Sequence, residues 1–125
     1  MDCEKMKEEE LTYIIRGCIY EVSKELGAGF LEQVYKNALL HELKNAGLKF
    51  EIEKKIPVQY KGAEVGHYAA DIIVQEKVIL ELKAQKQLTK AHEAQVLNYL
   101  KATSIKIGLL INFTHPKAEV KRYVL

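Results

Sequence analysis

The sequence predicts an α/β domain in which helices flank both faces of a mixed β-sheet. Two stretches with apolar residues at helical spacing open the chain, at about residues 11–26 and 31–43, and strand-like patterns follow them. A later helical stretch, at residues 90–101, separates a strand pattern at 78–83 from another at 105–111. Such a crossover joins parallel strands, whereas a short hairpin joins antiparallel ones, so the sheet should be mixed.

Each of the two N-terminal helices should end at a glycine. Gly27 and Gly29 follow the first pattern and Gly47 follows the second, and glycine is common just past a helix end. The apolar positions are Leu11, Ile14, Ile15, Cys18, Val22 and Leu26 in the first helix, and Leu31, Val34, Tyr35, Ala38, Leu39 and Leu43 in the second. We therefore expect Cys18 to lie in the core.

Short strand patterns follow the two helices. Residues 48–53 and 56–60 have strand character, and Pro57 indicates a sheet edge or a β-bulge, because proline cannot donate to a ladder. Lys61-Gly62 is a turn signal that leads into a hairpin. The two strands of that hairpin are expected at residues 68–75 and 78–84.

The C-terminal third should contain one helix and two strands. Thr89 can cap a helix over residues 90–101, with Glu93 near its first turn. The apolar run at residues 104–113 predicts a buried strand, and residues 119–125 predict a final edge strand.

Length and composition agree with one compact domain. The chain has 125 residues, of which 48% are hydrophobic and 29% are charged, and both values are ordinary for a globular protein. We expect a single domain over residues 1–125, with residues 1–8 as a flexible N-terminus.

Membrane insertion and secretion are not expected. No apolar stretch approaches the roughly 20 residues that a membrane-spanning helix needs, and the N-terminus lacks the apolar region of a secretion signal. Cys3 and Cys18 are too few for a disulfide framework or a zinc site. The cytoplasm is therefore the expected location.

The charge balance alone does not predict nucleic-acid binding. The formal net charge is only +2, and nearly all of the 19 basic residues are lysines; the arginines are Arg16 and Arg122. Lysine contacts phosphate as a point charge and reads bases poorly. Any binding to nucleic acid should therefore be weak in sequence preference and sensitive to salt.

Three charged residues interrupt the apolar pattern of the predicted hairpin. Asp71 lies in its first strand, and Glu81 and Lys83 lie on one side of the second. If the connection is the three residues 75–77, position 71 lies opposite position 81, with Cβ atoms roughly 5 Å apart. Two carboxylates at that spacing repel each other, and a divalent cation between them is the usual remedy.

The Glu-x-Lys spacing is weak evidence by itself. It recurs from Glu42, Glu53 and Glu119, where a solvated face explains it. The copy that starts at Glu81 differs because it lies in an apolar run, ten residues after an aspartate. An alternative stays open, in which Lys83 offsets both acids on a sheet face that is open to water.

Asp71 with Glu81-Leu82-Lys83 resembles the bipartite PD-(D/E)xK site of the restriction-endonuclease-like nuclease superfamily. The segment Gly29-Phe-Leu-Glu32-Gln-Val-Tyr35 is similar to the signature of the GxxExxY family, a branch of that superfamily. Two further segments agree with that family, Gln95-Val-Leu-Asn-Tyr99 and Gly108-Leu-Leu-Ile-Asn112-Phe113. The resemblance covers residues 11–123 and implies a restriction-endonuclease-like sheet with helices on both faces.

The chain departs from the pattern at two positions before Asp71. Ala70 replaces the proline of the motif, at a position that varies in the superfamily. Tyr68-Ala69 stands where an arginine is expected. If that arginine holds DNA in relatives, its loss lowers the expected affinity for DNA and leaves metal binding unaffected.

The resemblance implies a metal-dependent nuclease acting on nucleic acid, with DNA as the expected partner. Asp71, Glu81 and the Leu82 carbonyl would hold Mg²⁺ or Mn²⁺, and Glu32 would reach the metal or its waters. Lys83 would act as a catalytic residue. Gln95 would join the catalytic site by contacting phosphate or by holding Lys83.

Other residues of these motifs have simpler interpretations. Tyr35 should bury its ring and use its hydroxyl to orient a neighbour, and Tyr99 can serve packing or chemistry. The histidines are expected at the surface, without the spacing of a zinc motif, at His41, His67, His92 and His115.

Two functions without catalysis also stay open. The chain could be a binding module that keeps the fold but turns over no substrate. It could also form a homodimer in which the edge strand at residues 119–125 pairs with its copy. Metal binding would distinguish the enzyme from both.

Overall fold

The computed structural model describes residues 7–114 and 116–125. The elements in chain order are α1 (Glu8–Leu26), α2 (Glu32–Asn45), β1 (Phe50–Tyr60), β2 (Ala63–Val74), β3 (Val78–Lys83), α3 (Lys90–Ala102), β4 (Ile107–Asn112) and β5 (Glu119–Val124). The N-terminus expected to be flexible lies outside the described residues, apart from Lys7 and Glu8, and Glu8 already belongs to α1. Cys3 and His115 also lie outside them.

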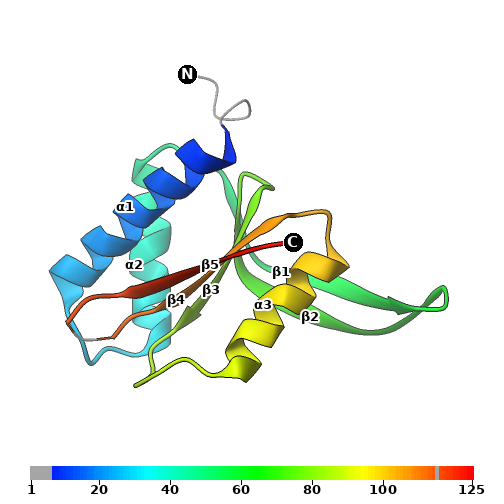
Figure 1. The fold of residues 1–125 in the computed structure, drawn as a ribbon. Helices are drawn as coiled ribbons and strands as arrows, with labels where there is room; N and C mark the ends of the chain where they lie inside the picture. Colours follow the sequence, from blue (N-terminus) through cyan, green and yellow to red (C-terminus); the bar gives the residue numbers. More distant parts are fainter. Residues whose placement is uncertain (1–6, 115) are drawn as a thin grey trace.

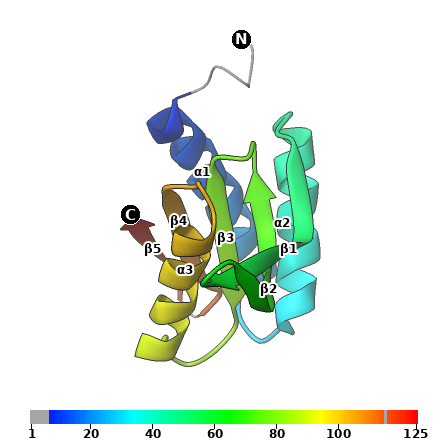
Figure 2. The ribbon, with the colours of Figure 1, turned by 90° about the vertical axis from the view of Figure 1, so that its right-hand side faces the viewer.

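The five strands form one mixed sheet in the order β1-β2-β3-β4-β5. The β3–β4 pair is parallel and the other pairs are antiparallel, which confirms the predicted crossover. Helices α1 and α2 cover one face and α3 covers the other (Figure 1, and turned by 90° in Figure 2). The prediction of a mixed sheet with helices on both faces is therefore confirmed.

The core has a larger and a smaller half, one on each face of the sheet. Side chains of α1 and α2, including Cys18 as predicted, pack with alternate residues of the central strands such as Leu80. On the other face, Tyr99 and Leu100 of α3 pack with Ile73 and Ile79. The central strands are thus buried on both faces, which explains their nearly continuous apolar sequence.

The β1–β2 hairpin differs from the prediction in length. One strand, β1, replaces the two segments expected at residues 48–53 and 56–60, and β2 begins at Ala63 instead of residue 68. β2 pairs with β3 only over residues 72–74, so its first part pairs with β1 alone and the hairpin extends past the sheet (Figure 1). Pro57 lies on edge strand β1, next to a register shift at Val58, which confirms the edge and bulge prediction.

Strand β4 is shorter than the run expected at residues 104–113. The Thr103 hydroxyl accepts a hydrogen bond from the Ile105 N–H (3.2 Å) and donates to the Tyr99 carbonyl (3.0 Å). This turn ends α3 and delays the strand to Ile107. At Gly108 the sheet touches α3, since a Cβ built there would lie 2.6 Å from Val96 Cγ1.

Candidate active site

The connection between β2 and β3 sets the register of the candidate site. The turn is closed by the Lys77 N–H donating to the Val74 carbonyl (2.9 Å), and Val74 pairs with Val78 across it. The predicted three-residue connection is therefore confirmed. The ladder ends with the pair of Ile72 and Leu80, so Asp71 and Glu81 are the first residues beyond it.

Two side chains replace the ladder where β2 separates from β3. The Glu81 carboxylate accepts a hydrogen bond from the Asp71 N–H (2.9 Å). The Asp71 carboxylate accepts one from the Leu82 N–H (2.8 Å). Each acid thus holds the backbone of the opposite strand, so the fork between the strands brings both carboxylates together.

Glu81 lies in an unusual electrostatic environment. Glu81 is only 3% exposed. Burial, and next the Asp71 carboxylate, raise the pKa of Glu81 to about 8. A buried carboxyl group beside a second one favours the neutral form in the absence of a cation.

Lys36 of α2 contacts this site, and sequence reasoning missed it. Its residue is 5% exposed, and its Nζ lies 3.2 Å from Glu53 Oε1 and 3.8 Å from Asp71 Oδ1. Glu53 belongs to β1 and has a φ of 50°. Its neighbours in β1 pair with the two neighbours of Asp71 in β2, so Glu53 lies across from Asp71. The lysine therefore links α2 to two strands beside the fork.

Glu32 starts α2 one turn before Lys36 and is largely exposed. Burial of its carboxyl group raises its pKa, the Lys83 ammonium opposes that change, and the Asp71 carboxylate adds to it. Glu32 therefore lies within electrostatic range of both. Among residues 7–114 and 116–125, no group of three or more His, Cys, Asp or Glu side chains is arranged to hold a metal ion.

Tyr35 fixes the loop in front of α2. Its hydroxyl donates to the Gly27 carbonyl (2.6 Å) and accepts from the Phe30 N–H (3.2 Å). Its buried ring stacks on Phe113, with centroids 4.6 Å apart. The prediction that Tyr35 buries its ring and orients a neighbour is confirmed, and the contact holds the turn from which Glu32 emerges.

Gln95 and Tyr99 approach the site from α3. The Gln95 amide donates to the Tyr99 hydroxyl (2.7 Å), which in turn donates to the Ala69 carbonyl (3.4 Å). Burial, and next the Glu81 charge, raise the pKa of Tyr99 to about 12, so Tyr99 lies near Glu81. In the described part of the chain, Gln95 has this tyrosine as its hydrogen-bond partner, with no bond to Lys83.

Asn112 holds the loop that follows Lys83. Asn112 is 1% exposed, and its side chain accepts from the Gln85 N–H and donates to the Gln85 carbonyl, both at 2.9 Å. The Lys83 carbonyl accepts from the Phe113 N–H (2.9 Å). The end of β4 therefore fixes the backbone on both sides of Lys83, while the Lys83 side chain is half-buried.

The sequence is similar to that of a known protein superfamily. A model of the PD-(D/E)XK nuclease superfamily matches residues 9–123. The chain belongs to this superfamily. No curated protein matched the chain.

A solved structure has a similar fold. The crystal structure of SSO0001 superposes with a TM-score of 0.57 at 20% sequence identity, over 94% of this chain and 58% of that one. At this identity the likeness shows the fold alone. The chain spans less than two thirds of the length of that protein.

Nucleases of the PD-(D/E)XK superfamily generally use divalent metal ions. None of the helices in the described part of the chain combines the length and apolar character needed to cross a membrane.

The histidines take structural or surface positions. The His92 ring accepts a hydrogen bond from the Thr89 backbone N–H (3.1 Å). The His92 backbone N–H donates to the Thr89 hydroxyl (3.3 Å), which completes a reciprocal cap of α3. This confirms the predicted cap. His41 and His67 are exposed, as predicted.

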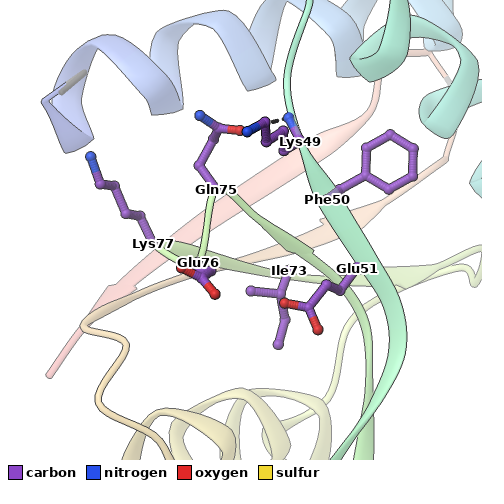
Figure 3. A pocket seen from close by; sticks show the side chains of 7 residues that line it. All are labelled: Lys49, Phe50, Glu51, Ile73, Gln75, Glu76 and Lys77. Atoms are coloured by element: carbon purple, nitrogen blue, oxygen red, sulfur yellow. Dashed lines mark hydrogen bonds between the residues drawn. The ribbon is translucent and has the colours of Figure 1, made fainter. Parts of the chain in front are cut away.

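Three surface pockets are lined by residues other than the acids of the fork. The largest of the three, about 660 Å³, surrounds the turn that joins β2 to β3 (Figure 3). That turn is the opposite end of the hairpin from Asp71. The acids of the fork therefore lie outside the lining of this pocket.

Proposed function

We propose that this chain is a divalent-metal-dependent nuclease of the GxxExxY branch, which hydrolyses phosphodiester bonds in DNA. The observation that carries the proposal is the fork itself, where Asp71 and Glu81 are held together beside Lys83. A structural role does not require a second carboxylate next to Glu81, whose charge burial already penalises.

The donors at the fork fit a hard cation. Carboxylate and carbonyl oxygens are the ligands that Mg²⁺ and Mn²⁺ prefer. Asp71 and Glu81 supply carboxylates, and the Leu82 carbonyl completes the proposed inner ligands. Leu82 directs its N–H toward Asp71, and the N–H and carbonyl of one strand residue point to the same neighbouring strand.

A bound cation would polarise the scissile phosphate and lower the pKa of a water molecule. Glu32, which lies within electrostatic range of the fork, would hold outer waters rather than the ion directly. Glu81, whose pKa is raised in the absence of a cation, would be ionised in that state, because a cation favours the charged form.

Lys83 is proposed as the catalytic cation. Protonated lysine has no lone pair for a metal, so it would position the attacking water and stabilise charge on the phosphoryl oxygens. Gln95 would approach the phosphate from α3, with Tyr99 fixing its amide. The net charge is only +2, so binding to nucleic acid would depend on contacts between lysines and phosphates. Such contacts weaken as the salt concentration rises.

Two experiments test this proposal. The first is cleavage of a panel of single-stranded, double-stranded and branched DNA and RNA with Mg²⁺ or Mn²⁺. We expect cleavage that a chelator abolishes. A wild-type protein that cleaves no member of the panel with either metal contradicts the proposal.

The second experiment is Mn²⁺ calorimetry on wild type, Asp71→Asn and Glu64→Gln. We expect Asp71→Asn to lose most of the binding, because it removes a charged ligand. Glu64 is an exposed carboxylate that pairs with Lys55 on the distant hairpin, so Glu64→Gln should bind like wild type. Equal binding by all three proteins contradicts the proposed site.

A second candidate is a non-catalytic module that pairs through its edge. β5 is an edge strand, and Val124 is 61% exposed there. An open edge can pair with a second copy of the chain. A homodimer by sedimentation, together with no metal binding, favours this candidate over the nuclease.

A further inference from the structure

A pocket of about 480 Å³ lies between the β1–β2 hairpin and α3. Its polar lining consists of Gln59 and Tyr68 from the hairpin and Asn98 and Lys101 from α3. We call it the hairpin–α3 pocket. Its volume falls within the range of roughly 300–1,000 Å³ that is typical of small-molecule sites.

The hairpin–α3 pocket adjoins the candidate active site through Tyr99. The Tyr68 ring packs edge-on against the Tyr99 ring, with centroids 5.4 Å apart. The Tyr99 hydroxyl donates to the carbonyl of Ala69, two residues before Asp71. Tyr99 therefore connects Tyr68, which lines the pocket, to the backbone that leads into the fork.

The lining side chains are available to a ligand. Tyr68 is 41% exposed, so part of its ring is open. Within the residues that the structure describes, no hydrogen bond or ion pair engages the side chains of Gln59, Asn98 or Lys101. The pocket thus offers an aromatic surface, two amides and one ammonium group without internal partners.

These groups match the parts of a nucleotide. An aromatic ring stacks on any nucleobase, and each side-chain amide presents both a donor and an acceptor to a base edge. An ammonium group pairs with phosphate. Lys101 is also the charged residue of the pocket lining, so no carboxylate there repels a phosphate.

The larger pocket in Figure 3 does not fit a nucleotide in this way. Glu51 and Glu76 contribute carboxylates to its lining. The Gln75 side chain already accepts from the Lys49 N–H (2.6 Å). That pocket also surrounds the turn that joins β2 to β3, away from the candidate active site.

We infer that the hairpin–α3 pocket binds one unpaired nucleobase of the substrate, next to the phosphodiester bond at the fork. The inference rests on the proposed function and narrows its substrate to nucleic acid with an unpaired base. A base inside a duplex is stacked on both sides and cannot enter a protein pocket without leaving the helix. Single strands and duplexes with a bulged base meet that requirement without this cost.

The first test is an NMR titration with a 5′-mononucleotide, which needs no cleavage. The side-chain amide signals of Gln59 and Asn98 should shift, and Tyr68→Leu should abolish the shifts. Leucine keeps an apolar side chain against Tyr99 but removes the aromatic face. Shifts that persist unchanged in Tyr68→Leu, or their absence in wild type, overturn the pocket.

The second test compares two short duplexes, identical except for one bulged base, by fluorescence anisotropy in Ca²⁺. Wild type should bind the bulged duplex about tenfold more tightly, a preference expected from one base–aromatic stack. Tyr68→Leu should bind both duplexes equally. Tyr13→Leu is the matched control, because Tyr13 is 79% exposed on α1, and it should keep the preference.

Failure of the pocket and failure of the nuclease give different results. If wild type cleaves nucleic acid but Tyr68→Leu keeps the full preference for the bulged duplex, the pocket is wrong and the nuclease stands. If the mononucleotide shifts both amides but no substrate is cleaved with any metal, the pocket stands and the nuclease is wrong.

Discussion

Single residues carry most of the chemistry at the fork, and Lys36 is one whose position the sequence pattern did not predict. In the sequence it directly follows Tyr35 within an amphipathic helix, where a lysine is typical of a solvated face. In the structure it is buried and lies beside Glu53 and Asp71. Its ion pairs join α2 to β1 and β2, and helical spacing does not encode such tertiary contacts.

We expect Lys36→Met to destabilise the protein by about 1 kcal/mol, because Asp71 loses its nearby cation while the volume is kept. The effect stays small because the Asp71 side chain is 23% exposed and Glu53 is more exposed still. Urea unfolding measures it, with Glu53→Gln as the milder control. A Lys36→Met protein at least as stable as wild type contradicts the role given to this lysine.

Glu81 should make stability depend on pH when no metal is present. Its pKa is about 8 in the folded chain against an ordinary value of 4.5, so the folded state binds the proton more tightly. The stabilisation is complete below the lower value and is lost as pH rises through the higher one. We expect the free energy of unfolding to fall by on the order of a few kcal/mol across that window.

Glu81→Gln isolates this effect, because glutamine cannot ionise. Its free energy of unfolding, measured in urea with a chelator present, should rise relative to wild type as pH increases from about 5 to about 9. Parallel pH profiles for the two proteins would show that Glu81 keeps an ordinary pKa.

At the scale of elements, the β1–β2 hairpin explains why strand prediction failed locally. Strands β3 and β4 are buried on both faces and have continuous apolar sequence. The outer part of the hairpin, residues 57–69, is almost entirely exposed, so it lacks the alternation that marks a half-buried strand. The sequence therefore located the strands of the core and missed the extension that forms the hairpin–α3 pocket.

The packing of α3 on β4 gives a paired prediction for two glycines. Gly108→Ala should destabilise by about 1–3 kcal/mol, because its Cβ would lie 2.6 Å from Val96 Cγ1. Gly17→Ala in α1, where a Cβ meets nothing within 4 Å, should stabilise by about 0.5–1 kcal/mol through helix propensity. Thermal or urea unfolding of both variants checks the pair, and destabilisation of equal size in both would contradict it.

For the whole molecule, the hairpin of β2 and β3 and the parallel pairing of β3 with β4 could be predicted from sequence, because the turn signals and the crossover rule act locally. The three-residue turn even gave the register that brings Asp71 opposite Glu81. The reciprocal bonds at the fork could not be predicted, because they exist only where β2 leaves β3 to follow β1. The contact between Lys36 and Glu53 could not be predicted either, because the two residues belong to separate elements.

The central claim is that Asp71, Glu81 and Lys83 form a nuclease site, and the cleavage rate of Lys83→Ala tests it most directly. The rate is measured at saturating Mg²⁺ on the best substrate of wild type, with Lys44→Ala as an exposed control. We expect Lys83→Ala to slow cleavage by roughly 10² or more while fold and most Mn²⁺ binding persist. Lys44→Ala should cleave like wild type. A Lys83→Ala protein that cleaves as fast as wild type would contradict the account.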